Sequence, residues 1–216
     1  MNADRIAIEE ALRSAAARLA GKRLLTSGGI LSQRIPELDA FVCVAVATAQ
    51  RAAGDVRWSP LSGAPANLHA RIYAARADVG AILSGDLAWT GALGRLGMSL
   101  PAVFDEQVRH LGVEAKRVAM LSTDDRPIGA LSNGASAYCL DDVALCLGMG
   151  LERLLLNIEI LEKCAESFVL AQCASAEVKR IPWLVGFIAN GRLKKDRKDA
   201  AARHLRGERS IMKAGY

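Results

Sequence analysis

The amino-acid sequence predicts an α+β protein built around a layered β-sheet. Predicted strands and helices follow one another in irregular order, and several neighbouring strands are separated by turns of the kind that join β-hairpins. A doubly wound protein would instead alternate strands with helices along the chain. The length of 216 residues, with 51% hydrophobic and 24% charged residues, fits one globular domain with at most an appended tail.

The first part of the chain is expected to form one helix and then a group of strands. In residues 3–20, apolar residues recur at helical spacing opposite Arg and Glu, which predicts an amphipathic helix. A glycine turn then leads into a strand whose alternate residues Ile30, Ser32 and Arg34 share one face. The next two runs are predicted to pair antiparallel across a loop. The three strands are expected at residues 26–34, 40–47 and 55–58.

The middle of the chain predicts two helices around a buried strand. Pro65 suits the first position of a helix that is expected to end near Arg76. An apolar strand follows at residues 79–83, and Ser84-Gly85-Asp86 then predicts a turn. A further helix is expected to end at Gly97.

The second half predicts two more strands and a long helix. Residues 117–121 and 128–131 are strand-like, and residues 124–127 predict the turn between them. The charges of Asp141 and Asp142 suit a helix N-terminus. A helix from there to Ala171 would be about 45 Å long.

The cysteines and the apolar runs indicate the cellular compartment in which the protein is expected. The five cysteines are an odd number without a CxxC pair, which favours reduced thiols. Charged residues throughout the first 20 positions argue against a signal peptide, and no run of 18 apolar residues occurs. We therefore expect a soluble cytoplasmic protein with no membrane partner.

The net charge of +5 is concentrated near the C-terminus. Residues 192–213 contain nine basic and three acidic residues, a charge of +6, which leaves 19 basic and 20 acidic residues, or −1, elsewhere. A basic tail can bind nucleic acid or an acidic protein. Alanines between these charges equally fit a solvated terminal helix or an oligomer contact, and nucleic-acid binding is the less favoured interpretation.

Four stretches, taken in order, resemble the class II aldolase/adducin family. The most specific runs from Leu68 to Leu83, with an LHxxIY-like helix, an Arg-x-Asp-Val turn and an apolar strand. The others are Gly29-Ile-Leu-Ser-Gln-Arg34, Trp89-Thr-Gly-Ala-Leu93, and Asn133-Gly134 with the long helix expected after it. The resemblance implies a three-layer α/β/α fold with a central, mainly antiparallel sheet. It places the class II aldolase/adducin-like domain at residues 1–175 and a C-terminal extension with the basic tail at residues 176–216.

The resemblance implies a zinc site whose ligands this chain lacks. In the family, a strand ends in HxH, a third His lies in an NHG turn, and an upstream Ser-Ser-Glu supplies the acid/base carboxylate. Three imidazoles then hold zinc with an open position. Here the corresponding residues are Ser84, Asp86 and Asn133, with Pro65 in place of the Glu. No cofactor is therefore predicted, although the family would imply a divalent metal such as zinc.

A small set of residues remains for binding or chemistry. The candidate catalytic residues are Asp86, Asn133 and His69. The candidate substrate-binding residues are Gly29, Ser32, Arg34 and Ser84, in the turn and strand that resemble the family's phosphate-binding segment or at the end of the metal strand. Each also has a structural interpretation, such as a packed histidine or a turn aspartate. His110 and His204 are assigned no role.

Three functional hypotheses follow. The first is a family member without metal chemistry that serves as a binding or structural subunit, in a homo-oligomer or beside an active paralogue. The second is a lyase, of aldolase, decarboxylase, dehydratase or epimerase type, that acts on a small hydroxy acid or sugar derivative through rebuilt cleft residues. In the third, the basic tail binds nucleic acid or an acidic protein, and the rest of the chain is an oligomeric platform that carries it. The resemblance also implies a tetramer-like ring with a possible small-molecule ligand in clefts between subunits.

Overall fold

A computed structural model describes residues 2–49, 52–63, 67–119, 126–141 and 143–211. Helices and strands follow each other in mixed order. The helices are α1 (Asn2–Gly21), α2 (Leu68–Ala75), α3 (Ala88–Arg95), α4 (Asp105–His110), α5 (Arg126–Ala130), α6 (Leu151–Cys173) and α7 (Trp183–Leu205), with short 3-10 turns η1 (Pro36–Leu38) and η2 (Leu131–Asn133). The strands are β1 (Leu25–Ile35), β2 (Ala40–Val46), β3 (Arg57–Pro60), β4 (Ala81–Leu87), β5 (Leu100–Pro101), β6 (Glu114–Arg117), β7 (Ala137–Leu140) and β8 (Val143–Gly148).

The strands form one sheet in the order β3-β2-β1-β4-β8-β7-β6-β5. Every pair of neighbours is antiparallel except β6 and β7, which run parallel. The predicted α+β class with a mainly antiparallel sheet is therefore confirmed. The pairing of β2 with β3 confirms the antiparallel partner expected for the run at residues 40–47.

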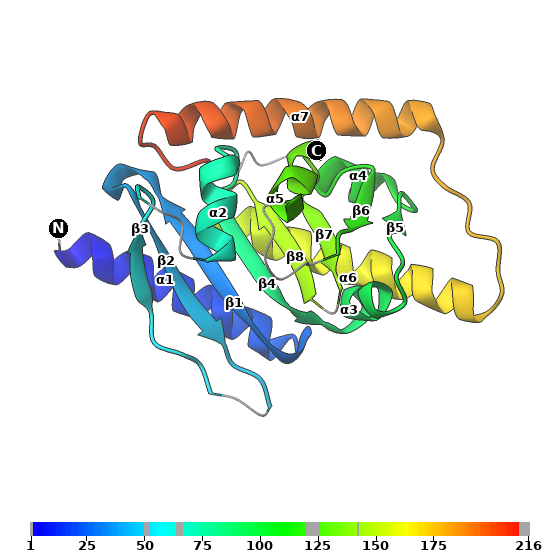
Figure 1. Cartoon of the computed structure of the whole chain (residues 1–216), viewed down its shortest axis with the longest axis horizontal. Helices are drawn as coiled ribbons and strands as arrows, with labels where there is room; N and C mark the ends of the chain where they lie inside the picture. Colours follow the sequence, from blue (N-terminus) through cyan, green and yellow to red (C-terminus); the bar gives the residue numbers. More distant parts are fainter. Residues whose placement is uncertain (1, 50–51, 64–66, 120–125, 142, 212–216) are drawn as a thin grey trace.

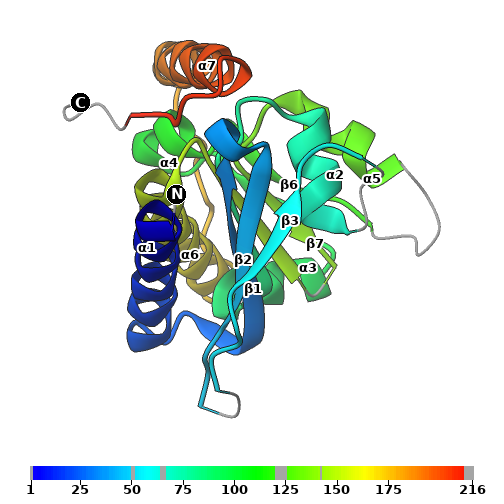
Figure 2. The same ribbon diagram turned by 90° about the vertical axis from the view of Figure 1, so that its left-hand side faces the viewer.

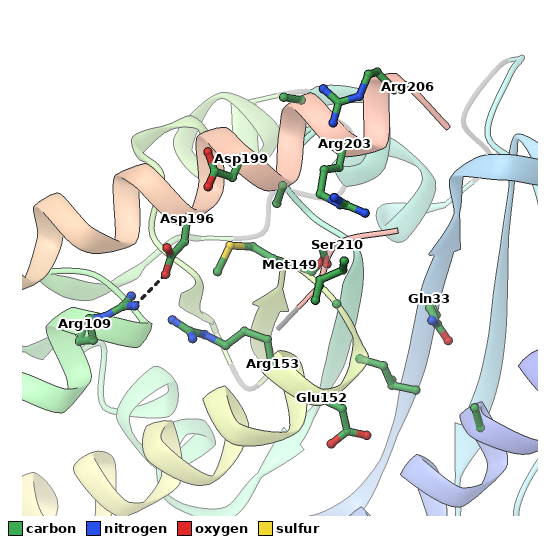
Figure 3. Close-up of a pocket in the computed structure, with 16 residues that line it drawn as sticks. Gln33, Arg109, Met149, Glu152, Arg153, Asp196, Asp199, Arg203, Arg206 and Ser210 are labelled. Carbon is green, nitrogen blue, oxygen red and sulfur yellow. Dashed lines mark hydrogen bonds and ion pairs between the residues drawn. The ribbon is translucent and has the colours of Figure 1, made fainter. Parts of the chain in front are cut away.

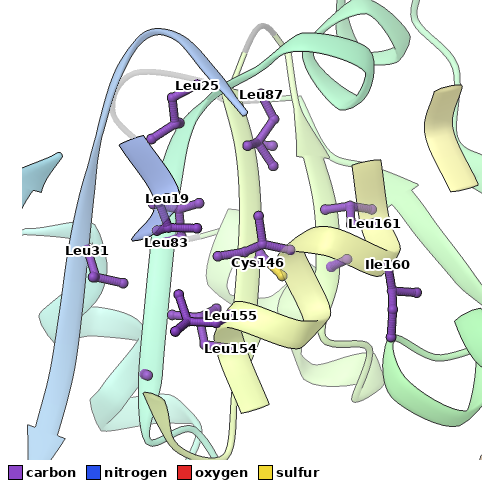
Figure 4. Close-up of a cluster of buried hydrophobic side chains, with 14 of the residues drawn as sticks. Leu19, Leu25, Leu31, Leu83, Leu87, Cys146, Leu154, Leu155, Ile160 and Leu161 are labelled. Atoms are coloured by element: carbon purple, nitrogen blue, oxygen red, sulfur yellow. The ribbon is translucent and has the colours of Figure 1, made fainter. Parts of the chain in front are cut away.

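Helices cover both faces of the sheet (Figures 1 and 2). α1 and α6 lie on one face, where their leucines and isoleucines pack with Leu31, Leu83 and Cys146 of the strands (Figure 4). α2 and α5 lie on the other face, over a smaller core that contains Ile72 and Tyr138. β4 contributes side chains to both cores, because successive residues of a strand point to opposite faces of the sheet.

A close approach of β1 and β4 fixes the end of β4. Gly29 pairs with Gly85, and a Cβ atom on Gly29 would lie 2.9 Å from the carbonyl oxygen of Ser84. A glycine inside a strand often marks such an approach of two backbones. The same pairing explains why the predicted turn at residues 84–86 is wrong: these residues continue β4 to Leu87.

α3 begins directly after β4 and is capped from another helix. Its N-cap residue Leu87 has no side chain that can accept a hydrogen bond. The buried carboxylate of Glu162 in α6 instead accepts the backbone N–H groups of Trp89 and Thr90, at 3.0 and 2.9 Å, and the hydroxyl of Thr90. A negative charge is favourable at this end of a helix.

The basic tail forms a helix that packs on the body. α7 lies across one end of the sheet, beside α4 (Figure 1). Three of its side chains hold it there: Asp196 pairs with Arg109 at 2.8 Å, Arg197 with Asp78 at 2.6 Å, and His204 Nδ1 lies 2.7 Å from the carbonyl oxygen of Ala77. Within the described part of the chain, no helix is both long enough and apolar enough to cross a membrane.

The second half of the chain departs from the prediction. The long helix begins at Leu151 and not at Asp141, because β7 and β8 form a hairpin first. Asp141 has a φ of 47°, a left-handed turn conformation that Asp tolerates better than most residues. An Asp-Asp pair suits such a turn as well as a helix start.

Two further element predictions need correction. Residues 128–131, expected as a strand, lie in α5 and η2, since short apolar runs do not distinguish helix from strand. Of the strand expected at residues 117–121, only Arg117 lies in a strand, at the end of β6, and residues 118 and 119 lie in none. The structure does not describe Pro65, residues 120 and 121 of that strand, or residues 124 and 125 of the predicted turn. The other two residues of that turn, 126 and 127, begin α5.

Candidate functional site

A chain of hydrogen bonds links four side chains under α2. His69 lies between two serines of adjacent strands: its Nδ1 is 2.8 Å from Ser32 Oγ, and its Nε2 is 2.8 Å from Ser84 Oγ. Ser32 Oγ is also 2.8 Å from the hydroxyl of Tyr73. His69, Ser32 and Tyr73 are buried, whereas Ser84 is half-buried. The structure thus brings together His69, Ser32 and Ser84 of the candidate residues.

Sheet register and helix spacing build this chain. In the pairing of β1 with β4, Ser32 faces Ile82 and Ile30 faces Ser84, so the two serines lie on the same face of the sheet. On α2, His69 and Tyr73 are four residues apart and therefore share the helix face toward the strands. Tyr73 was not among the predicted site residues, although its i+4 spacing from His69 was the signal that would have found it.

Burial keeps His69 neutral. Removal from water lowers the pKa of its imidazole to about 4. Burial also raises the pKa of the Tyr73 phenol, although the hydrogen bond with Ser32 acts in the opposite direction, so this hydroxyl stays protonated. The neutral imidazole has one N–H donor and one acceptor nitrogen, which suits hydroxyl groups on both sides.

The depressed pKa of His69 predicts loss of stability in mild acid. Between an ordinary pKa of 6.5 and the folded value of about 4, the unfolded chain binds more protons at this residue than the folded protein does. The free energy of unfolding should therefore fall as pH drops from 6.5 toward 4, with a slope that approaches about 1.4 kcal/mol per pH unit for each such histidine. Urea unfolding at a series of pH values measures this slope.

The variant His69→Gln tests the assignment, because Gln retains polar contacts but does not titrate. We expect it to remove one histidine's share of the slope. His110, whose pKa burial and the nearby arginines also lower to about 4, should supply a similar share that remains. An unchanged slope in His69→Gln would contradict the buried, neutral state of His69.

Asp86 lies on the same face of β4 as Ser84 but has other partners. Its carboxylate accepts hydrogen bonds from the hydroxyls of Thr26 and Ser27 and pairs with Arg95 at 3.3 Å. Partial burial opposes its charge, but these hydrogen bonds and the charge of Arg95 hold the pKa of Asp86 below its ordinary value. A general base for use at neutral pH needs a pKa nearer to 7.

Asn133 belongs to a separate cluster. Its Oδ1 accepts hydrogen bonds from the hydroxyl of Tyr138 at 2.6 Å and from the N–H of Ala135 at 3.0 Å. The two strands β7 and β8 separate Asn133 from α6, so it does not stand in a turn that directly precedes the long helix. The expectation that the long helix follows Asn133 directly is therefore wrong, whereas the correspondence of Asn133 to the family's third His stays a prediction.

The remaining candidates have structural partners. Gly29 sits at the close approach of β1 and β4 described above. Arg34 stacks on the ring of Tyr73, 4.9 Å from its centroid, and donates to the carbonyl oxygens of Tyr73 and Arg76 at the end of α2. A cation is favourable at the C-terminus of a helix. Arg34 also lines a cavity of about 360 Å³ beside the tail residues His204 and Gly207.

The residues at the end of β4 do not fit a catalytic zinc ion. Such an ion takes three protein ligands, most often imidazole nitrogens. Here the nearest imidazole, His69, uses both nitrogens on serines, and the carboxylate of Asp86 is held by Arg95 and two hydroxyls. Across the described residues, no group of three or more His, Cys, Asp or Glu side chains is arranged to hold a metal ion.

Comparisons with solved structures show what the fold resembles. An L-fuculose 1-phosphate aldolase superposes with a TM-score of 0.68 at 18% identity, over 86% of this chain and 95% of that one. An L-fuculose 1-phosphate aldolase from Glaciozyma antarctica gives 0.67 at 19% identity, over 98% and 94%. An aldolase II superfamily protein from Pseudomonas syringae gives 0.63 at 19% identity, over 94% and 96%.

No protein-family model and no curated protein sequence matches the chain. The likeness lies in the fold, at identities below 20% for these three structures. The chain has the class II aldolase fold, as the resemblance in its sequence implied.

Proposed function

We propose that this chain, which has the class II aldolase fold, works without the family's three-histidine zinc chemistry and serves as a binding or structural subunit. The observation that carries the proposal is the state of the groups at the end of β4. Ser84 is bonded to the neutral His69, and Asp86 is ion-paired with Arg95. Neither is a free metal ligand, and the pKa of Asp86, held below its ordinary value, does not suit an acid or base for neutral pH.

Metal content and turnover test this proposal together. The protein would be purified without chelators and its metals measured, and it would then be assayed with added zinc on L-fuculose 1-phosphate and related sugar phosphates. We expect less than stoichiometric metal and no cleavage. Stoichiometric zinc, or turnover that zinc supports and a chelator removes, would refute the proposal.

A second candidate function is a lyase that acts on a small hydroxy acid or sugar derivative. One observation favours it: the hydroxyl of Ser84 is half-buried and hydrogen-bonded to a neutral imidazole that Ser32 orients. In such an arrangement His69 can accept a proton from Ser84 Oγ, as a base does for an activated hydroxyl. Asp86 and Asn133 remain candidate contributors in this version of the function.

A metal-free substrate panel of hydroxy acids and sugar derivatives distinguishes the two functions. Turnover that disappears in Ser84→Ala and His69→Gln would establish the lyase and assign its proton transfer. Turnover lost in Asp86→Ala but not in those variants would move the chemistry to Asp86. No turnover by the wild-type protein on any member of the panel supports the non-catalytic subunit.

We also propose that residues 1–175 form the aldolase-like domain and that the extension from residue 176 contributes to a homo-oligomer. The support is an apolar surface at the start of α7, defined by Trp183, Leu184, Phe187 and Ile188. Trp183 is 79% exposed and Phe187 71% exposed, and their rings contact each other edge to face. Apolar side chains gathered in this way are typical of protein–protein contacts.

The double variant Trp183→Ser/Phe187→Ser tests this role of α7. We expect light scattering after size exclusion to give a mass above 23.0 kDa for the wild-type protein and close to 23.0 kDa for the variant. Lys194→Ser, an exposed change on the same helix, should leave the wild-type mass unchanged. A monomeric wild-type protein would contradict the proposal.

A further inference from the structure

A cavity of about 640 Å³ lies between the start of α6 and the C-terminal half of α7 (Figure 3). It is separate from the groups at the end of β4. Gln33, which lines it, pairs with Ala81 at the start of β4, whereas Ser84 and Asp86 stand near the other end of that strand. The volume is in the range of small-molecule binding sites, about 300–1,000 Å³.

Arg153, which lines this cavity, has two buried hydrogen-bond donors that are not satisfied in the described part of the chain. Only 8% of it is exposed, and its Nε and Nη2 are buried without a hydrogen-bond acceptor in the described part of the chain. Arg109 is in a similar position, because Nη1 is buried without an acceptor while Nη2 pairs with Asp196. In Figure 3 the guanidinium of Arg153 points toward Arg109 and Asp196 across the cavity.

An unpaired guanidinium inside a protein is costly. A buried charge normally has a counter-ion, and buried donors normally have acceptors. Asp196 satisfies Arg109 in part and leaves three buried nitrogens of the two arginines unbonded. Burial, together with the nearby charge of Arg109, lowers the pKa of Arg153, as expected for two cations near each other. An acceptor from outside the chain would resolve this imbalance.

The start of α6 adds to the positive potential. Its N-cap residue Gly150 has no side chain to accept the first N–H groups of the helix, and the first-turn residues Leu151, Glu152 and Arg153 line the cavity. The N-terminus of a helix of this length attracts anions through free N–H groups and the helix dipole.

Other side chains limit where an anion fits. Charges of both signs line the cavity: Asp196 and Asp199 of α7 and Glu152 of α6 are acidic, whereas Arg203 of α7 and Arg206, which follows that helix, are basic. Because Asp196 already pairs with Arg109, a negative group belongs against Arg153, whose buried donors have no acceptor among the described residues. Met149, Leu151 and Ile211 give an apolar surface nearby. A ligand with one anionic end and a small organic body matches this division.

We propose that the cavity binds a small organic anion, whose carboxylate or phosphate group accepts hydrogen bonds from Arg153 and Arg109 at the N-terminus of α6. Its organic part lies against Met149 and Leu151. The site is independent of the function proposed above, since it uses none of the residues at the end of β4.

Binding of defined anions to the full-length protein tests this site. Calorimetry and thermal unfolding in a zwitterionic buffer would compare inorganic phosphate, glycerol 3-phosphate, pyruvate and succinate, with chloride at matched ionic strength. Phosphates and carboxylates form separate arms, so the preferred group is read directly. The variants are Arg153→Met and, as a matched control, Arg57→Met, which removes an exposed arginine of β3.

We expect saturable binding of at least one anion to the wild-type protein and to Arg57→Met. Arg153→Met should weaken that binding by roughly tenfold or more, because hydrogen bonds to a charged group are lost. It should also unfold at an equal or higher temperature without ligand, since the unpaired buried charge is gone. If Arg153→Met does not fold, Arg153→Lys, which keeps the charge but loses the two-pronged geometry, should show the same weakening.

Two results would overturn the proposal. One is that no anion stabilises the wild-type protein beyond the effect of chloride. The other is equal affinity of an anion for the wild-type protein and the Arg153 variant, which would place its binding elsewhere.

Discussion

Asp78→Ala is expected to destabilise the protein by about 3–5 kcal/mol, the cost of removing one partner from a buried ion pair. Asp78 lies at the turn between α2 and β4 and accepts two hydrogen bonds of 2.8 Å from Arg76. The side chain of Arg76 is 7% exposed, so the variant would leave a buried charge without its counter-ion. Arg197 of α7 loses the same partner. Urea unfolding measures the change.

The control for this variant is Asp55→Ala, which changes an exposed aspartate and should alter the free energy of unfolding by less than about 0.5 kcal/mol. Acid dependence gives a second readout. Burial opposes the charge of Asp78, but Arg76 and then Arg197 hold its pKa at about 2, below the ordinary 3.8. Its contribution is thus complete above pH 4 and is lost as pH falls toward 2. A loss below about 1 kcal/mol in Asp78→Ala would contradict the role of this cluster.

The sequence predicted well the elements that have strong periodicity. α1 was expected at residues 3–20 and spans Asn2–Gly21, because its apolar stripe, with Ile8, Leu12 and Leu19, packs on the sheet. β2 was found for a related reason, since its β-branched run suits a buried strand. Such patterns act locally and can be recognised without knowledge of the partners.

The hairpin of β7 and β8 was missed because its signals are ambiguous. The strands are four and six residues long, and their apolar residues merge with those of α6 in the sequence. The turn between them depends on the left-handed conformation of Asp141. Without the hairpin, the sequence predicted a long helix directly after the Asn133-Gly134 turn, whereas α6 begins only at Leu151.

The sequence predicted residues of the candidate site but not the hydrogen bonds that connect them. Ser32, His69 and Ser84 are far apart in sequence, and only the register of β1 against β4 and the packing of α2 bring them together. The same tertiary arrangement directs Asp86 to Arg95 and Asn133 to Tyr138. The cavity beside Arg153 depends on where α7 folds back, which the charge pattern of the tail does not specify.

Replacement by alanine is expected to have opposite effects on stability at two helical glycines, Gly94 in α3 and Gly191 in α7. In Gly94→Ala the new Cβ would overlap the carbonyl oxygen of Asp141, with the carbonyl carbon 2.8 Å away. Because backbone atoms cannot move aside without shifting the hairpin, we expect a loss of about 3 kcal/mol or more. Gly191 in α7 has no atom within 4 Å of the same position, so Gly191→Ala should stabilise by up to about 1 kcal/mol through helix propensity. Urea unfolding of the two variants distinguishes the cost of steric overlap from the gain in helix propensity. If Gly94→Ala did not lower the free energy of unfolding, α3 would not pack against Asp141 as described.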